Sequence, residues 1–250
     1  MWGLTWALIL FAPRRAVSFH FPPLLQNLSQ PRLWWRLLVA RTQTRFNALL
    51  SETMLRLASI PPGRLRPQLK LRKKALVPTA KALHRALSQA LARGDVSALR
   101  KTAMPVLYAS LAAKMQQRRR GRRFEWTLLR YTATPRLLIH TVEQMPLDTT
   151  GTATLVTRQA VVSIASRQRL VEYDDVKGRG VVVSEKEVDL VERIIIMAIV
   201  DQGTYETGEW KVWGFGEEAT LDEYQSARAF MRQMQKDEAA KQKAKLRSIS

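Results

Sequence analysis

Apolar side chains recur at helical spacing through most of the first half of the chain. Over residues 31–60, aromatic and aliphatic residues alternate with arginines, and Pro31 stands where the first turn of a helix tolerates proline. We predict an amphipathic helix here, ended by the Ile-Pro-Pro-Gly sequence at 60–63. Aromatic residues interleaved with arginine suit an anionic lipid surface or an RNA groove, and they equally suit a helix packed on its own domain.

A second helix is predicted over 79–93, where leucines and alanines form an apolar stripe. Thr79 is its expected N-cap, and Gly94 is expected to end it. Asp95 then offers an N-cap for a further helix. Pro105 is expected to start another one, since a proline deep inside a helix would kink it.

After Arg123 the apolar period changes to that of extended strands. We predict strands over 124–131, 136–145, 153–173, 187–201 and 209–215. Turns are predicted at 174–180 and 201–208 from their Gly and Asp content. Two long strands on either side of one turn form an antiparallel hairpin. Strands this long must curve, and Gly214 and Gly216 are candidate kinks.

The tail returns to helical spacing at Thr220, which stands at capping-box distance from Glu223. A stripe of Met and aromatic residues follows, of the kind that belongs to a core or a docked helix. The last polar residues lose this stripe, and we expect them to fray.

Charge separates the two halves of the chain. Residues 1–123 carry 24 Lys and Arg against only Glu52 and Asp95, whereas residues 124–250 carry 17 Lys and Arg and 19 Asp and Glu. The net charge of +20 therefore resides in the first half. A polycationic half beside a nearly neutral one is typical of binding to a large polyanion, either nucleic acid or an anionic membrane face.

Two segments concentrate these cations, one at 64–74 and one at 118–123. The first lacks counter-charges and contains Pro67, so we expect no stable free helix there and a role in phosphate contact. The second places five arginines at a helix end, more than the helix dipole requires, and we expect it to bind phosphate as well. The predicted RNA-binding residues are Arg64, Arg66, Lys70, Arg72, Lys73, Lys74, Arg118, Arg119, Arg120, Arg122 and Arg123.

The N-terminus combines apolar and arginine-rich character. Residues 1–13 form an apolar run that is too short to span a bilayer, and the positive residues follow it, unlike those of a secretory signal. Six Arg, no Lys and no acid over residues 1–50 are typical of a mitochondrial targeting region, with a retained arm or a membrane-surface anchor as alternatives. The predicted membrane- or partner-binding residues are Trp2, Trp6, Trp34, Trp35, Arg36, Arg41 and Arg45.

Motifs for catalysis or metal binding are sparse. The absence of Cys excludes disulfides and thiolate zinc sites, and three isolated His leave little for another metal site. Gly178-Arg179-Gly180 lacks the glycine spacing of a phosphate-binding loop, and His140 is expected to be satisfied by its neighbours and not to act as a base. We expect neither enzymatic activity nor a cofactor, although a site assembled from distant residues on a concave sheet stays open.

Three stretches of the sequence carry a resemblance to a known family. A helical pair with a Gly-Asp joint, ALARGDVSALRKTAMPVLYASL, precedes the strand sequences RQAVVSIASRQ and WKVWGF. Over residues 78–218 the chain resembles the domain shared by mitochondrial large-subunit ribosomal proteins at the tunnel exit, among them membrane-associated mitoribosome receptors, and by the inner-membrane import subunit that tethers the import motor. The resemblance implies an α+β, cone-like fold related to nuclear transport factor two, with a strongly bent antiparallel sheet packed on helices.

This resemblance suggests a division of the chain into three parts. They are a basic N-terminal extension over 1–77, the cone-like α+β domain over 78–218, and a C-terminal helix and tail over 219–250.

The resemblance also implies a non-enzymatic function on the matrix side of the inner mitochondrial membrane. The expected partners are large-subunit rRNA, neighbouring mitoribosomal proteins, and the inner membrane with its cardiolipin-type lipid and insertion machinery. The protein would hold the ribosome near the membrane for co-translational insertion, without a small-molecule substrate. The alternative is a membrane-peripheral import or tethering component that binds anionic lipid without contacting RNA.

Overall fold

The computed structural model describes residues 31–118, 121–146, 154–174 and 181–216, together with Ser226, Ala229 and Gln233. The chain divides into two compact units, and the described residues 46–216 belong to the larger one while residues 31–45 belong to the other. Residues 1–30 of the predicted targeting region, the turn after Asp174 and all of the tail helix from Thr220 except those three residues lie outside the described residues.

The described elements confirm the predicted α+β class. The helices are α2 (Pro31–Ala58), the short 3-10 helix η2 (Lys73–Ala75), α3 (Leu76–Arg93), α4 (Val96–Thr102) and α5 (Pro105–Gln116). The strands are β1 (Arg122–Tyr131), β2 (Arg136–Pro146), β3 (Thr154–Asp174), β4 (Val181–Val200) and β5 (Lys211–Phe215).

Local signals set most helix ends correctly. Gly94 ends α3 with φ 72°, a left-handed conformation that glycine adopts without strain. The Asp95 carboxylate accepts from the Ala98 amide (3.0 Å) as the N-cap of α4, and Pro105 begins α5. The prediction of Thr79 as a cap was wrong, because α3 begins at Leu76 and the first turn tolerates the intervening proline.

The sheet is built around β3. One edge of β3 pairs antiparallel with β4 along almost its whole length, and its other edge pairs with β1 and then with β2. β4 begins at Val181, well before the predicted start at Glu187. The first residues of β4 were missed because three consecutive charged residues stand at 185–187. These charges find cross-strand partners, as in the Arg169–Glu185 ion pair (2.7 Å).

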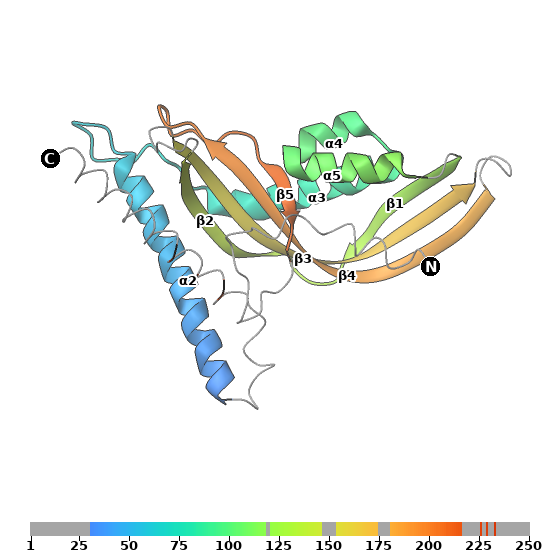
Figure 1. Ribbon diagram of the computed structural model, residues 1–250, viewed down its shortest axis with the longest axis horizontal. Coiled ribbons are helices and arrows are strands. Elements are labelled where there is room, and N and C mark those ends of the chain that lie inside the picture. The colour runs from blue at the N-terminus through green and yellow to red at the C-terminus, as the bar shows by residue number, and fades with distance from the viewer. Residues whose placement is uncertain are drawn as a thin grey trace. The chain divides into compact units, whose positions relative to one another are not determined.

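Irregular pairing bends these long strands. The register shifts between Leu128 and Arg130, between Leu137 and Ile139, and opposite Trp213, next to the predicted kink at Gly214. The ribbon shows the sheet curving, with α3, α4 and α5 grouped along one side of it (Figure 1).

The central part of the sheet is buried on both faces. Leucines and alanines of α3, α4 and α5 pack against one face, where the central strand residues include Ala160, Val162, Ile164, Ile194 and Ile196. On the opposite face, Ala48 of α2 packs against Ile139, Val161 and Ile195. The second half of α2 is thus part of the larger unit, and Ala48 packs on the sheet face that the other helices leave uncovered. Leu55 of α2 belongs to a separate cluster with Val142, Val156 and Val200.

The packing on the helical face leads to a stability prediction. Leu87 of α3 is completely buried in the main cluster, so Leu87→Ala should lower the free energy of unfolding by about 3 kcal/mol. Val106 of α5 is 57% exposed, and Val106→Ala should change it by less than about 0.5 kcal/mol. Urea unfolding followed by circular dichroism measures both values, and an equal loss in the two variants would contradict this packing.

Candidate polyanion-binding surface and its buried anchor

The loop between α2 and η2 carries the first predicted basic segment, and its base is closed by Ser59. The Ser59 carbonyl accepts from the Gln68 amide (3.2 Å), and the Ser59 hydroxyl accepts from the Leu69 amide (3.2 Å). The Leu69 side chain is buried in a small apolar cluster with residues of α2, β2, β3 and β4. The Tyr205 hydroxyl donates to the Ala58 carbonyl (3.1 Å). The loop is therefore attached to the sheet at its base.

A buried arginine of β3 holds the far end of this loop. Arg158 is 2% exposed, and its Nη2 donates to the carbonyl of Leu71. Its Nη1 donates to the carbonyl of Lys70 (3.5 Å) and to Oγ1 of Thr207 (2.7 Å). The guanidinium also lies 5.2 Å from the ring centroid of Trp210. A buried guanidinium needs acceptors for its N–H groups, so it fixes the loop carbonyls in place.

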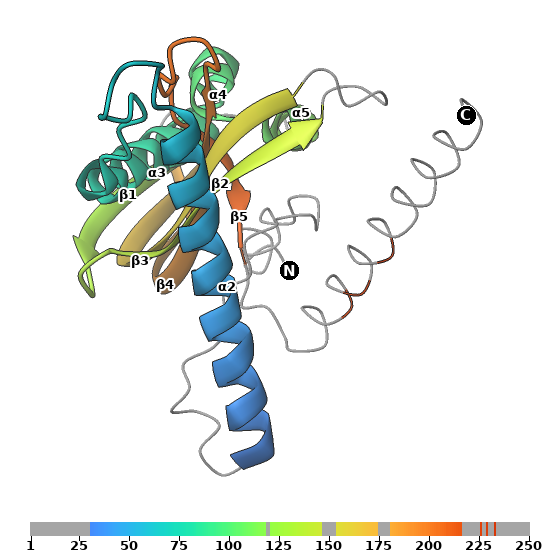
Figure 2. The ribbon, with the colours of Figure 1, turned by 90° about the vertical axis from the view of Figure 1, so that its left-hand side faces the viewer.

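The buried Glu52 compensates the charge of Arg158 through the imidazole of His140. His140 of β2 contacts Oε1 of Glu52 of α2 through Nδ1 (2.5 Å). Figure 2 shows β2 beside the second half of α2. Its Nε2 accepts from Nε of Arg158 (3.3 Å). Since Nε2 accepts, the neutral imidazole carries its proton on Nδ1 and donates it to the carboxylate. The imidazole thus links an anion of the helix to a cation of the sheet.

The pKa values of these groups follow from this arrangement. Burial lowers the pKa of His140, the Arg158 charge acts in the same direction, and together they outweigh the Glu52 contact. Burial alone would raise the pKa of Glu52, but hydrogen bonds with His140 and Lys73 prevail and lower it. Burial lowers the pKa of Arg158 to about 10, which leaves it charged at neutral pH.

Most of the predicted phosphate-binding side chains of this loop are exposed and unengaged. No hydrogen bond or ion pair to another described residue involves the side chains of Arg64, Arg66, Lys70, Arg72 and Lys74. Arg72 has φ 41°, a strained conformation that persists where neighbouring contacts over-determine it. Lys73 is different, because its Nζ lies 2.6 Å from Oε2 of Glu52. The segment 64–74 therefore presents five exposed cations, and its backbone is held to the domain at residues 68–71.

The second predicted segment is used largely inside the domain. Arg118 donates to the Ala92 carbonyl (3.4 Å) and lies over the ring of Phe124. Arg122 is paired with two carboxylates, those of Glu172 (2.9 Å) and Asp174 (3.6 Å).

Arg123 lies over the ring of Tyr173 (4.3 Å to the centroid), whereas Arg119 and Arg120 lie outside the described residues. Phosphate binding by this segment stays a prediction, and for Arg122 it would compete with the domain's own acids.

The structure describes five of the seven predicted membrane-binding residues. Trp2 and Trp6 lie outside the described residues. On α2, Trp34 is half-buried and Trp35 is 60% exposed. Arg36 and Arg45 are exposed, whereas Arg41 is half-buried.

Sequence reasoning missed the anchor of the loop, although it expected His140 to be satisfied. Arg158 shares its sheet face with Ala160 and Val162, so a cation at a core position was the available signal. Glu52 is the only acid before Asp95, and that isolation could have marked it as a buried partner. The pairing itself joins residues far apart in sequence and could not be read from spacing.

A second buried polar cluster lies between α3 and the sheet. Nε2 of His84 lies 2.9 Å from Oε2 of Glu192, which accepts from Nε2 of Gln168 (2.5 Å). The Trp126 indole donates to Oε1 of Gln168 (2.8 Å). Ile164 and Ile196 fill the adjoining sheet face with apolar packing. These polar groups bond to one another, so their arrangement stabilises the fold beneath α3.

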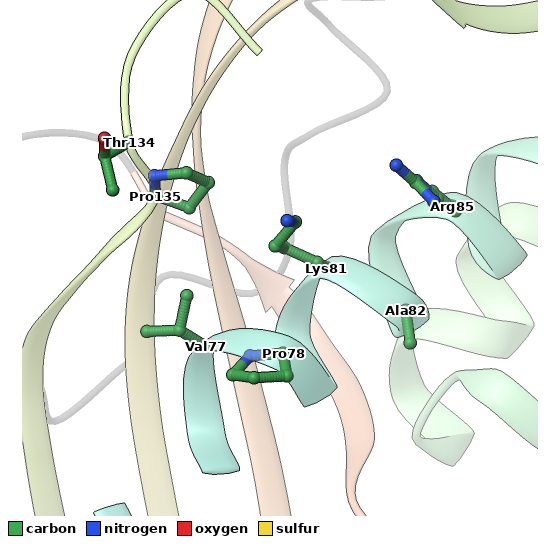
Figure 3. Close-up of a pocket in the computed structure, with 7 residues that line it drawn as sticks. All are labelled: Val77, Pro78, Lys81, Ala82, Arg85, Thr134 and Pro135. Atoms are coloured by element: carbon green, nitrogen blue, oxygen red, sulfur yellow. The ribbon is translucent and has the colours of Figure 1, made fainter. Parts of the chain in front are cut away.

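A shallow pocket of about 370 Å³ lies where α3 passes the connection between β1 and β2 (Figure 3). Lys81 and Arg85 of α3 line it, opposite Thr134 and Pro135. Both cations also lie over the ring of Tyr131, at 4.3 Å and 5.6 Å from its centroid. This pocket adds positive charge to the helical side of the domain.

Among the described residues, no group of His, Cys, Asp and Glu is arranged to hold a metal ion. No helix within the described ranges has both the length and the apolar character needed to cross a membrane.

The chain matches a protein-family model over nearly its whole length. The family is described as MBA1-like protein, and the match covers residues 14–245. A search of curated proteins finds no match. Among solved structures, the chain is similar to the intermembrane-space region of the chloroplast protein ARC6, with 13% sequence identity and a TM-score of 0.30, over 58% of this chain and 98% of that chain. A TM-score this low supports no conclusion about fold or function.

The buried anchor predicts that replacing Glu52 and replacing Lys73 lower the free energy of unfolding by different amounts. Glu52→Gln leaves the buried Arg158 without a compensating charge and should lower the free energy of unfolding by about 3 kcal/mol. Lys73→Gln removes a cation that is half in solvent and should cost less than about 1 kcal/mol. Urea unfolding at neutral pH compares them, and equal losses would show that Glu52 compensates no buried charge.

The lowered pKa of His140 predicts acid sensitivity with a defined sign. Below the ordinary histidine pKa of 6.5, the unfolded chain binds a proton that folded His140 resists, so the free energy of unfolding should fall as the pH drops from 6.5. His140→Gln should reduce this decline by about 1 kcal/mol between pH 7 and pH 5. Unfolding curves across this range provide the measurement, and coinciding slopes for the two proteins would refute the assignment.

Proposed function

Because the chain belongs to the MBA1-like protein family, which is associated with the mitochondrial membrane and the ribosome, we propose that it is a protein of the mitochondrial large ribosomal subunit or one bound to it. In this proposal it binds rRNA phosphates near the tunnel exit and links the ribosome to the inner membrane for co-translational insertion. It acts as a structural adaptor and not as an enzyme.

The fixed cationic loop is the observation that carries this proposal. Five exposed cations lie on a segment whose backbone is held at residues 68–71 by Ser59 and Arg158. Binding phosphates through such a loop releases condensed counterions and requires little ordering of the chain. Contacts of this kind position a protein on RNA without reading its sequence, as a structural ribosomal contact requires.

The loop at 64–74 is favoured over the arginines at 118–123 as the main contact. Arg122 would have to leave Glu172 and Asp174 before it could bind phosphate. Arg118 and Arg123 are also engaged with aromatic rings of the domain. The loop cations can bind phosphate without breaking a described contact within the domain, so they are the better phosphate ligands.

The proposed partners are those that the family resemblance implies. They are large-subunit rRNA, neighbouring mitoribosomal proteins, and the cardiolipin-type lipid and insertion machinery of the inner membrane, met from the matrix side. Neither a cofactor nor a small-molecule substrate belongs to this proposal.

One observation favours the alternative of a membrane-peripheral tether without RNA contact. Leu65 stands between Arg64 and Arg66 and is 96% exposed. An apolar side chain flanked by cations also suits the headgroup region of an anionic bilayer. Phosphate is common to both partners, so ribosome binding has to be measured directly.

Charge reversal in the loop tests the proposal. Arg64→Glu/Arg66→Glu/Lys70→Glu should weaken binding to isolated mitochondrial large subunits and lower the slope of log affinity against log salt by about 2 to 3. The matched control Arg93→Glu/Arg100→Glu/Arg130→Glu reverses three exposed arginines elsewhere in the domain. It should change that slope by less than about 1.

Co-sedimentation over a range of potassium chloride concentrations gives both slopes. Equal slopes for the two triple variants would contradict phosphate binding by the loop. Unmodified protein that remains free of large subunits at low salt would contradict the ribosomal function as a whole.

A further inference from the structure

The second half of α2 is apolar on two opposite faces. Its inner face docks on the sheet through Ala48 and Leu55 and carries the buried Glu52. A helix docked in this way ordinarily turns polar residues toward water. Here five of the exposed positions are occupied by large apolar residues, which are Phe46, Leu49, Leu50, Met54 and Leu57.

These five residues, the α2 stripe, form a continuous exposed row. They are 45% to 64% exposed, and their spacing places them around the side of the helix opposite Ala48 and Leu55. The row is about 17 Å long at the rise of an α-helix. Single exposed apolar side chains are ordinary on protein surfaces, but a contiguous row of this size marks an interaction surface.

The charges around the stripe indicate what covers it. The only acid of α2 is Glu52, and it is buried against His140 and Lys73. The helix sequence also contains five arginines, including the exposed Arg56. A surface with large apolar residues, cations at its borders and no exposed carboxylate complements an anionic lipid interface.

Other occupants fit the stripe less well. RNA would require cations within the row, and all five members are uncharged. A partner helix is usually held in a groove, whereas this row stands on one helix and presents a convex surface. A bilayer interface needs no complementary shape.

We infer that the α2 stripe is the surface by which the domain lies on an anionic bilayer, with the side chains of Phe46, Leu50 and Met54 inserted at the headgroup boundary. This inference rests on the proposed function, because it names the surface that meets the membrane in the proposed link. In this arrangement α2 contacts the sheet through its inner face and the bilayer through its outer face.

A single fluorescent label tests the contact directly, since the chain contains no Cys. Leu50→Cys in the full chain is labelled with an environment-sensitive fluorophore and mixed with vesicles of equal parts phosphatidylcholine and cardiolipin. We expect a blue shift and quenching by spin labels in the upper acyl chains. The control is Val106→Cys, which should show neither change. Val106 is 57% exposed and lies on α5, which packs against the opposite sheet face.

Binding by unlabelled variants gives an independent measurement. Phe46→Ser/Leu50→Ser/Met54→Ser should lower vesicle affinity by about tenfold or more. Val96→Ser/Val106→Ser, which changes exposed valines of α4 and α5, should stay within about twofold. Both variants should bind large subunits as the unmodified protein does, since their loop cations are unchanged.

The outcomes separate this inference from the proposed function. A label at position 50 that senses no lipid, in a protein that binds both vesicles and ribosomes, overturns the inference and leaves the function standing. A label that is shielded by large subunits instead of lipid assigns the stripe to RNA or protein and also overturns the inference. If the unmodified chain binds neither ribosomes nor vesicles, both proposals fail.

Discussion

A buried guanidinium is the constraint on which the candidate site depends. Arg158 sits at a core position of the central strand, and removing such a charge from water is tolerated only when its donors are satisfied. Two of its acceptors are backbone carbonyls of the basic loop, and a third is the imidazole that leads to Glu52. The buried Arg158 thus holds the backbone at Lys70 and Leu71, within the segment that carries the exposed cations.

The same residues connect three parts of the domain. Glu52 belongs to α2, His140 to β2 and Lys73 to η2, so the helix, the sheet and the loop share one polar cluster. In the proposed function, the loop binds ribosomal phosphate and the outward face of α2 binds lipid. Both surfaces then adjoin the same buried polar cluster. This suits a protein that holds a ribosome at a fixed position relative to a membrane.

Elements with local determinants could be predicted from the sequence. Gly94 and Asp95 set the joint between two helices, and Pro105 set the start of the next, because each acts on its own neighbours. The start of β4 could not be predicted, since its charged residues become compatible with a strand only when partners such as Arg169 lie across from them.

The site was predictable in part for the same reason. The concentration of charge at 64–74 is visible in the sequence, and the structure leaves most of those cations exposed. The intramolecular partners of Arg122 and the anchoring role of Arg158 depend on contacts across the sheet, which no spacing along the chain encodes.

Photo-crosslinking from position 65 tests the central claim most directly. A photoreactive residue in place of Leu65 stands between Arg64 and Arg66 at the exposed end of the loop. In large subunits isolated from cells, the account predicts a crosslink to rRNA that is lost when Arg158 is replaced by Gln in a protein that remains folded. A crosslink to lipid alone, or an RNA crosslink that persists without Arg158, would contradict it.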